Sequence, residues 1–298
     1  MKILNFGSLN IDMVYDVINF VKPGETISST KYSVFCGGKG LNQSIALARA
    51  GVDLYHAGKV STDGRSLVEI LNENSVKTDF VSLDGTYTGH AIIQVDSKGQ
   101  NSILLCGGAN KELTKEYIDF VLNHFEANDI LVLQNEINHL EYIINKANKK
   151  GMRIVLNPSP IDKKIIEIDF NMINLLVLNE IEGKAIANVL QEEEIIDKLI
   201  YKYPNLKIVL TLGENGSMYG ENNFRLTEQI LKTEVVDTTA AGDTFLGYFV
   251  AGLILDKSPS ECLNLATVAS SLAVSKKGAS ISIPFMKEVL ERNDKHDE

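Results

Sequence analysis

Four short, nearly unbroken apolar runs constrain the fold of this chain more than any other feature. They cover residues 130–133, 153–156, 175–178 and 207–210. A strand is apolar along its whole length when both of its faces are buried, as in a parallel sheet covered by helices. Segments of helical length separate the runs, and this alternation is typical of a doubly wound sheet. The sequence therefore predicts an α/β fold, with a doubly wound, mainly parallel sheet flanked by helices.

Two β-rich patches, residues 11–36 and 85–107, do not follow this alternation. Short β-prone segments at 90–95 and 101–105 flank Asp96-Ser97-Lys98-Gly99, which predicts a hairpin. Both patches are antiparallel in character, so we expect a small antiparallel β sheet. This sheet either forms a lid over the main domain or supplies edge strands to the main sheet.

The lid interpretation divides the chain into two units. The patches end at Gly37-Gly38 and Gly107-Gly108, which are candidate hinges because glycine adopts backbone conformations closed to other residues. The predicted core comprises 1–10, 37–84 and 108–298, and the predicted lid comprises 11–36 and 85–107.

Charge and cysteine content limit the partners and the compartment. The chain of 298 residues has a formal net charge of −10, which repels nucleic-acid phosphates and anionic lipids, so we expect neither nucleic acid nor a membrane as partner. Cys36, Cys106 and Cys262 are odd in number and far apart, which favours a reducing compartment. No run approaches the ~18 apolar residues of a membrane span, and residues 1–7 become polar too early for a signal peptide. These features predict a soluble, cytoplasmic protein.

Polar residues follow each of the four apolar runs. They are residues 134–136, Asn157, residues 179–180 and Thr211. In an open parallel sheet the carboxyl ends of the strands border the ligand crevice, so these groups predict a polar cleft. The alternative is that they are ordinary turn and N-cap residues, which are often Asn or Thr.

The segment from Val235 to Phe245 is the most informative for chemistry. A β-run is expected to enter a turn of small residues at 240–242, and an apolar helix is expected over 245–255. Ligand atoms can approach the backbone N–H groups of such a turn, where the helix dipole favours an anion. Asp243 beside that turn is either a general base that accepts a proton from an attacking hydroxyl, or simply the helix N-cap.

Several other chemistries are disfavoured. Gly38-Lys39-Gly40 begins a dinucleotide fingerprint, but Gln43 stands at the position of its third glycine, so a dehydrogenase is disfavoured. The chain has no P-loop motif, no H-E-x-x-H motif and no Cys/His metal cluster, and a His-centred triad is also disfavoured. Taken alone, Lys39 is more typical of a solvated side chain, and Asn42 of a polar residue in a first helical turn.

The motifs Gly37-Gly38-Lys39-Gly40 and Asp237-Thr-Thr-Ala-Ala-Gly-Asp243 resemble the two signatures of the ribokinase-like (PfkB) carbohydrate kinases. Further matching segments, in the order and spacing of the family, are 7–12, 23–26, 179–182, 211–213 and 277–279. The resemblance spans essentially the whole chain. It implies ATP-dependent phosphorylation of a sugar hydroxymethyl group with Mg²⁺, with D-ribose as the first candidate and D-ribose 5-phosphate and ADP as products.

The resemblance also assigns residues to sites. Asp243 is the implied base, and the implied anion hole is Ala240, Ala241 and Gly242 with Asp243. The positions that match sugar contacts are Asn10, Asp12, Gly38, Lys39, Asn42, Glu136 and Asp243. The positions that match the nucleotide site are Asn179, Thr211, Gly213, Glu214, Asn215, Gly216, Gly242 and Thr267. Glu182 matches a Mg²⁺-linked acid that acts through water. A K⁺ site is implied at Asp237, Thr239, Ala273, Lys276, Gly278 and Ser282.

The side-chain types suit a sugar. Asp12 and Glu136 accept hydrogen bonds from hydroxyls, whereas Asn10 and Asn42 donate or accept them. Such a site rejects ligands that lack a hydroxyl, because its buried polar groups are then unpaired. Closure of the lid is expected to exclude water, and in the family the lid also pairs two subunits, which implies a homodimer.

Three alternatives remain from the sequence. The first is that the chain is another kinase of the same family, which acts on fructose, 2-keto-3-deoxygluconate or a nucleoside. A non-catalytic sugar-binding regulator on the same fold and a dehydrogenase are the other two.

Overall fold

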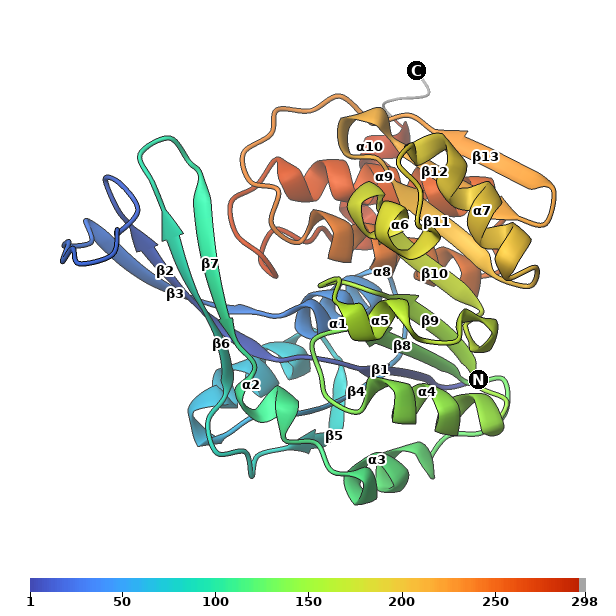
Figure 1. The fold of residues 1–298 in the computed structure, drawn as a ribbon, viewed down its shortest axis with the longest axis horizontal. Helices are drawn as coiled ribbons and strands as arrows, with labels where there is room; N and C mark the ends of the chain where they lie inside the picture. The colour runs from blue at the N-terminus through green and yellow to red at the C-terminus, as the bar shows by residue number, and fades with distance from the viewer. Residues whose placement is uncertain (295–298) are drawn as a thin grey trace.

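The computed structural model describes residues 1–294. Residues 295–298, which end the predicted core segment 108–298, lie outside the described residues. A large sheet with helices on both faces forms most of the molecule, and a smaller sheet projects from one side of it (Figure 1). Within residues 1–294, no helix has the length and apolar character needed to cross a bilayer.

The large sheet has nine strands within the described residues. In spatial order they are β13 (Phe224–Glu228), β12 (Ser217–Glu221), β11 (Lys207–Thr211), β10 (Leu175–Asn179), β9 (Arg153–Asn157), β8 (Ile130–Gln134), β1 (Ile3–Phe6), β4 (Tyr55–Lys59) and β5 (Lys77–Ser82). All neighbours from β5 to β11 are parallel, whereas β12 and β13 add an antiparallel edge. The four apolar runs are β8 to β11, so the predicted doubly wound, mainly parallel sheet is confirmed.

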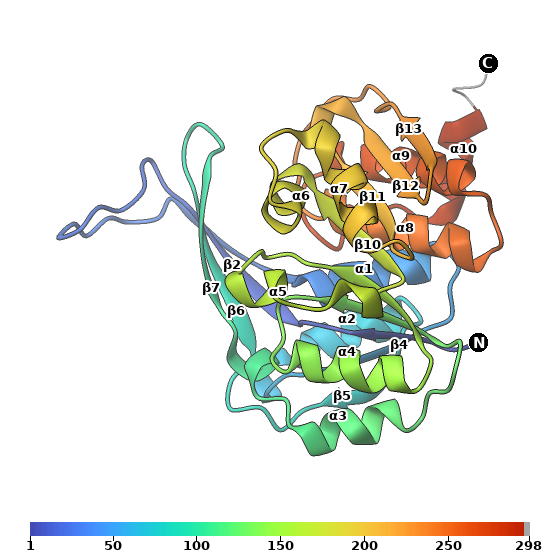
Figure 2. The ribbon, with the colours of Figure 1, turned by 45° about the vertical axis from the view of Figure 1, so that its right-hand side comes forward.

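Alternate residues of each strand face two separate apolar cores. Leu131 and Leu133 of β8 pack on one face, and Ile130 and Val132 pack on the other. The first face is covered by α3 (Lys115–Leu122), α4 (Leu140–Lys149), α5 (Lys163–Ile166), α6 (Glu180–Ala187) and α7 (Ile195–Lys202). The second face is covered by α1 (Lys39–Arg49), α2 (Arg65–Glu73), α8 (Ala241–Ile254) and α9 (Pro259–Val274), with α10 (Met286–Asp294) against α9. Figure 2 shows the sheet between these two groups of helices.

The small sheet has the strand order β3 (Lys31–Gly37), β2 (Asn10–Asp16), β6 (Gly89–Val95) and β7 (Asn101–Cys106). The outer pairs, β2 with β3 and β6 with β7, are antiparallel as predicted, but the central pair of β2 with β6 is parallel. These strands form a sheet of their own, so the interpretation as edge strands of the main sheet is wrong. Their far ends extend away from the rest of the molecule in both views (Figures 1 and 2).

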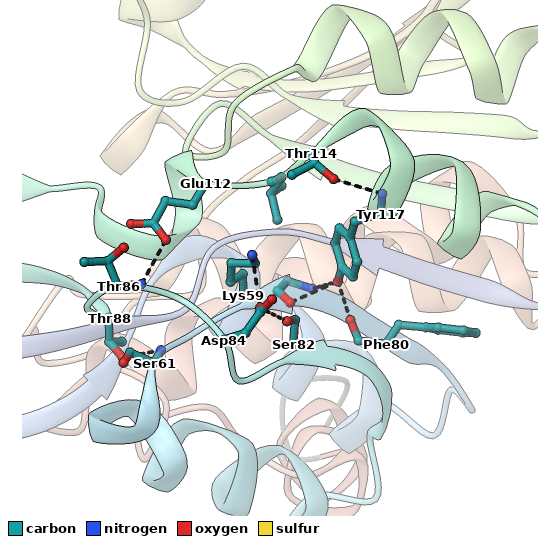
Figure 3. Close-up of polar contacts among 12 residues, drawn as sticks. Lys59, Ser61, Phe80, Ser82, Asp84, Thr86, Thr88, Glu112, Thr114 and Tyr117 are labelled. Atoms are coloured by element: carbon teal, nitrogen blue, oxygen red, sulfur yellow. Dashed lines mark hydrogen bonds and ion pairs between the residues drawn. The ribbon is translucent and has the colours of Figure 1, made fainter.

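Polar contacts fix the segment that leads from β5 into β6 (Figure 3). The ammonium of Lys59, at the end of β4, lies 3.0 Å from the Asp84 carboxylate. The Thr88 hydroxyl accepts a hydrogen bond of 3.0 Å from the backbone N–H of Ser61. These contacts join the entry to the small sheet to the end of a main-sheet strand.

The segment before α8 differs from its prediction. The β-run expected at Val235 and Val236 is wrong, because both side chains are exposed and the segment forms no strand. The backbone N–H groups of Val236 and Asp237 instead donate to the carbonyl of Val274, at 2.8 and 3.1 Å. The chain therefore approaches α8 along the end of α9, and α8 begins at Ala241, earlier than the expected start at residue 245.

Candidate active site

The polar residues that follow the parallel strands lie at one edge of the main sheet. Gln134 at the end of β8 is in register with Asn157 of β9, and Asn179 at the end of β10 is in register with Thr211 of β11. Chain order reverses between β1 and β8, which is the point where open parallel sheets place a crevice. The structure thus brings these strand ends together as the cleft interpretation requires.

The turn at the start of α8 opens toward solvent. Ala240 precedes the helix in the left-handed conformation, with φ of 61°, and makes no side-chain cap. Gly242 is exposed, and its Cα faces open space. The N–H of Ala241 donates to the carbonyl of Thr238 at 3.2 Å. The N–H groups of Gly242 and Asp243 belong to the first helical turn, where N–H groups have no partner within the helix.

The Asp243 side chain is buried in the first turn of α8, and Ala240 holds the N-cap position, so the N-cap alternative for Asp243 is wrong. The Asn42 amide donates to Oδ2 of Asp243 at 3.0 Å, and the Gln43 amide donates to Oδ1 at 2.9 Å. Both amides come from consecutive residues near the start of α1. Each carboxylate oxygen therefore keeps one acceptor position beyond these two bonds.

Close packing of α1 on α8 makes this contact possible. Gly247 lies one turn after Asp243, and Ala46 lies one turn after Asn42. A Cβ on Gly247 would lie 2.4 Å from the Ala46 Cβ. The glycine therefore lets the two helices approach closely enough for the side chains of their first turns to meet.

An acidic pair lies on the side of the small sheet. Burial, and then the charge of Glu136, raise the pKa of Asp12 on β2 to about 7. Glu136, after β8, accepts hydrogen bonds from the Ser8 hydroxyl and from the backbone N–H of Lys39, the latter at 3.1 Å. Asn10, at the start of β2, is buried and its Oδ1 accepts from Asn110 at 2.7 Å.

Lys39 follows Gly38, which has φ of 96°, at the start of α1. Burial lowers the pKa of Lys39, but the carboxylates of Asp243, Glu136 and Glu182 outweigh it and raise the pKa overall. The Lys39 ammonium therefore lies in the field of acidic groups from three different elements of the cleft.

The residues predicted for the nucleotide divide into two groups. Asn179 caps α6 and forms a capping box with Glu182, with hydrogen bonds of 2.9 and 3.1 Å. After β11 the chain forms an exposed 3₁₀ turn at Gly213–Asn215, which ends at Gly216 with φ of 90°. Thr211 is half-buried at the end of β11, and Thr267 is half-buried on α9.

The residues predicted for a monovalent cation come from two segments that meet. Oδ1 of Asp237 accepts from the N–H and hydroxyl of Thr239, at 2.9 and 2.6 Å, and Oδ2 accepts from the Gly278 N–H at 3.0 Å. Burial alone would raise the pKa of Asp237, but these hydrogen bonds outweigh it and lower the pKa overall. Lys276 forms an ion pair of 2.8 Å with Glu288.

The two remaining cation-site residues lie beside this contact in the chain. The carbonyl of Ala273 accepts from the Lys276 N–H at 3.1 Å, and the hydroxyl of buried Ser282 donates to the carbonyl of Ala279 at 2.8 Å. Among the described residues, no three His, Cys, Asp or Glu side chains gather as a metal site.

Sequence reasoning named Gln134 only as one of the polar residues that follow the strands, and it missed Gln43 and Asn5 behind Asp243. Gln43 and Gln134 are fully buried and hydrogen-bonded to each other, as are Asn5 and Gln134. Their signal in the sequence is a polar residue inside an apolar segment, such as Asn5 in the strand Ile3–Phe6. Their partners come from distant parts of the chain, which the sequence pattern does not reveal.

An open, uncapped helix start beside a buried carboxylate, with the acidic groups of Glu136 and Glu182 around the nearby Lys39, suits a group-transfer enzyme that handles an anion and a hydroxylated substrate. The family described as pfkB family carbohydrate kinase matches residues 1–286. The chain belongs to this family, and it is a carbohydrate kinase.

Individual relatives are similar over nearly their whole length. A ribokinase of Haemophilus influenzae is 32% identical over 294 residues, which cover 96% of this chain and 96% of that protein. The crystal structure of a Cryptococcus neoformans ribokinase in complex with ADP has a TM-score of 0.85 and 33% identity, and covers 98% of this chain and 99% of that chain. An Arabidopsis thaliana ribokinase complexed with ribose and ATP has a TM-score of 0.84 and 30% identity, with 98% of each chain covered.

Proposed function

We propose that this protein transfers the γ-phosphoryl group of ATP to the hydroxymethyl group of D-ribose, giving D-ribose 5-phosphate and ADP. The observation that carries the proposal is the Asp243 carboxylate, which is held by two amides next to the open turn at Gly242. The relatives named ribokinase, including one solved with ribose and ATP, support ribose and ATP as the substrates.

In this mechanism the oxygen of the sugar hydroxyl attacks the γ-phosphorus of ATP, and Asp243 accepts the proton of that hydroxyl. The turn of Ala240, Ala241 and Gly242, with Asp243, stabilises the negative charge on the transferred group. The N–H groups of Gly242 and Asp243 are the main donors, since the N–H of Ala241 is already bonded to Thr238.

We assign sugar recognition to the acidic side of the cleft. Asn10, Asp12 and Glu136 lie where strands β2 and β8 approach the cleft, and they offer acceptors for several hydroxyls. Gly38, Lys39 and Asn42 complete the site from the start of α1. The Oδ1 atom of Asn42 is buried without a protein partner, which suits a bond to a substrate hydroxyl.

The nucleotide is proposed to lie along the ends of β10 and β11. The residues assigned to it are Asn179, Thr211, Gly213, Glu214, Asn215, Gly216, Gly242 and Thr267. Mg²⁺, which would neutralise charge on the ATP phosphates, fits Glu182, because Mg²⁺ usually keeps several waters and uses one or two carboxylates. Oε2 of Glu182 is used in the capping box of α6, and the same carboxylate contributes to the field on Lys39.

A K⁺ ion fits the contact between Asp237, Thr239 and Gly278, with Ala273, Lys276 and Ser282 beside it. The ion would supply positive charge near this acidic side chain and would help to order the turn before α8. Activity measured in KCl should exceed activity in NaCl at equal ionic strength. Equal rates in the two salts would remove the ion from the proposal.

The small sheet is proposed to be a lid, residues 11–36 and 85–107, that covers the sugar and pairs two subunits. Exposed apolar side chains on its outer strands support a homodimer, because such patches mark protein contacts. They are Tyr32, Val34, Ile103, Leu104 and Leu105. A cytoplasmic location is part of the same proposal, and the free thiols of Cys36, Cys106 and Cys262 suit a reducing compartment.

A coupled assay of ADP release tests the function directly. Ribose, deoxyribose, fructose, 2-keto-3-deoxygluconate and nucleosides are compared at equal concentrations with ATP, Mg²⁺ and K⁺. Ribose should give the highest kcat/KM, and D243N should lower kcat by orders of magnitude while nucleotide affinity is retained. If another acceptor gives a higher kcat/KM, that acceptor and not ribose is the substrate. No turnover with any acceptor would favour a sugar-binding regulator.

A further inference from the structure

A connected group of buried amide side chains lies behind Asp243, and the proposed mechanism does not use it. We call Gln43, Gln134 and Asn5 the amide relay. Oε1 of Gln43 accepts from Nε2 of Gln134 at 2.6 Å, and the same Nε2 donates to Oδ1 of Asn5 at 2.9 Å. All three side chains are fully buried, with 0% of their surface exposed.

The direction of each hydrogen bond in the relay follows from Asp243. A carboxylate only accepts, so the amino group of Gln43 must face it and the carbonyl of Gln43 must face away. That carbonyl requires a donor, which Gln134 supplies. Gln134 then needs an acceptor for its second proton, which is Oδ1 of Asn5. The second amino proton of Gln43 points to Oδ1 of Asn157, at 3.5 Å.

The partners at the far end of the relay, beyond Asn5, are all uncharged. Nδ2 of Asn5 donates to the Gly40 carbonyl and to the Ser44 hydroxyl, both at 2.8 Å. The Ser44 proton is therefore available to Nδ1 of His56, which lies 2.8 Å away. Burial lowers the pKa of His56 to about 3, so the ring is neutral at physiological pH, and Nδ1 accepts this bond in the tautomer that carries its proton on Nε2.

From this geometry we propose that Gln43 is a positioning residue for Asp243, and that Gln134 and Asn157 fix the orientation of its amide. The inference rests on the proposed role of Asp243 as the base. Gln43 does not touch the substrate in this proposal. It holds Oδ1 of the carboxylate while Asn42 holds Oδ2, so that the remaining acceptor positions are aimed at the sugar hydroxyl.

Burial makes this positioning effective. Reversal of the Gln43 amide would set its oxygen against a carboxylate oxygen and add further unpaired buried groups to Oε1 of Gln134, which has no protein partner, and this is costly away from water. The relay therefore allows one orientation of Gln43 and disfavours the other. A base displaced by about 1 Å can lose roughly 100-fold in rate, so a fixed carboxylate is a direct contribution to kcat.

The first test is a double-mutant cycle with Q43M and D243N, assayed with ribose and ATP. Methionine is similar in length and makes no such hydrogen bonds. Q43M should lower kcat by about 10- to 100-fold while the KM values for ribose and ATP stay within about 3-fold. In the D243N background the same change should cost less than about 2-fold, because no carboxylate remains to be positioned.

Two other results of the cycle would overturn the proposal. One is a Q43M enzyme with wild-type kcat. The other is an equal loss in the wild-type and D243N backgrounds, which would mean that Gln43 supports the structure alone. Wild-type protein without sugar-kinase activity would instead refute the proposed function, so the two failures are distinguishable.

A second variant leaves both Gln43 and Asp243 in place. Q134M keeps the approximate length of the side chain but removes the donor on which the Gln43 carbonyl depends. The Gln43 amide is then no longer held in one orientation, so kcat should fall by about 10-fold or more with little change in KM. Unchanged kcat in folded Q134M would refute the role of Gln134.

The control is N74L, at the end of α2. Asn74 is a half-buried amide that accepts from Arg49 at 2.7 Å and donates to the Ile70 carbonyl at 2.8 Å. This variant should lower the melting temperature while kcat stays at the wild-type value. A kcat loss in N74L as large as that in Q43M would mean that lost stability alone explains the effect.

Discussion

The Asp12 carboxylate should destabilise the free protein at neutral pH, and this can be measured. Burial and the neighbouring Glu136 raise its pKa from 3.8 to about 7 in the folded state. Between these two values the folded protein holds a proton that the unfolded chain has released. Stability therefore falls as pH rises from about 4 to about 7, and the full cost is present above that window.

The magnitude follows from the difference between the two pKa values. A difference of about three pH units, at ~1.4 kcal/mol each, amounts to ~4 kcal/mol. D12N replaces the carboxyl with a neutral amide of the same shape. At pH 8 the variant should therefore be more stable than wild type by up to ~4 kcal/mol, whereas near pH 4 the two proteins should differ little.

Urea denaturation of both proteins at pH 4.5 and pH 8 measures this difference, with the slope m checked for constancy. A difference in unfolding free energy that is the same at both pH values would refute the reasoning. E136Q is the matched control, because it removes the second cause of the raised pKa. In E136Q the loss of stability should begin at the same pH, near 4, but end at a lower pH than in wild type.

The same variant tests the function of Asp12. D12N should bind ribose much more weakly although it is the more stable protein. Higher stability with weaker binding is expected where a buried polar group destabilises the free protein but binds the ligand. A D12N protein with unchanged KM for ribose would place the sugar elsewhere.

Three further predictions concern small residues around the cleft. A240G should raise the unfolding free energy by ~0.5–1 kcal/mol in thermal melts and preserve kcat, because alanine is strained at φ of 61°; a less stable variant would contradict this. G37A should raise the KM for ribose more than it changes kcat, because its Cβ would lie 2.0 Å from Oδ2 of Asp12; wild-type KM would count against the assigned sugar site. G247A should force α8 from α1 against Ala46, lowering stability by ~1–3 kcal/mol and kcat together; full activity would show that Asp243 needs no close helix contact.

The sequence predicts the central part of the main sheet because its physical cause is local. Strands β8 to β11 are buried on both faces, so each appears in the sequence as a short, nearly unbroken apolar run. The same reasoning places their polar ends at one edge, since parallel strands share a direction. Four observed strands match four predicted runs for this reason.

Other strands carry no such local signal. β4 contains the polar residues His56 and Lys59, whose side-chain partners, Ser44 and Asp84, lie outside the strand. The parallel pairing of β2 with β6 joins segments nearly eighty residues apart, with Asn10 opposite Gly89, and antiparallel pairing would show the same composition. Sequence composition indicates that such segments are strands but does not give their partners.

The candidate site shows the same limit. Asp243 is conspicuous because an acid beside a turn of small residues is unusual. Gln43 is not, because one glutamine near a helix start has many ordinary explanations. Its importance comes from the approach of α1 to α8, which depends on contacts such as Gly247 with Ala46. Residues that act through their neighbours become visible only when the packing is known.

Side-chain caps are present at some helices and absent at others. Side chains cap α3, α6 and α9, through Thr114, Asn179 and Ser258. Gly38 before α1 and Ala240 before α8 have positive φ and make no side-chain cap.

A missing side-chain cap gives up about 1 kcal/mol of helix stability at an alanine, and only a few tenths at a glycine. The missing cap is not confined to α1 and α8, since α2, α4 and α7 also begin without one. At Ala240, however, the small residues leave a ligand room to reach the N–H groups at the start of α8, whereas the first N–H groups of α1 are already bonded to Glu136, Ser8 and Gly38. Together with the raised pKa of Asp12 and the strain at Ala240, this means that several local stability costs gather at one edge of the sheet. The two apolar cores on either side of the sheet offset these costs, and the expected gains in stability from A240G and D12N are therefore a test of where the binding site lies.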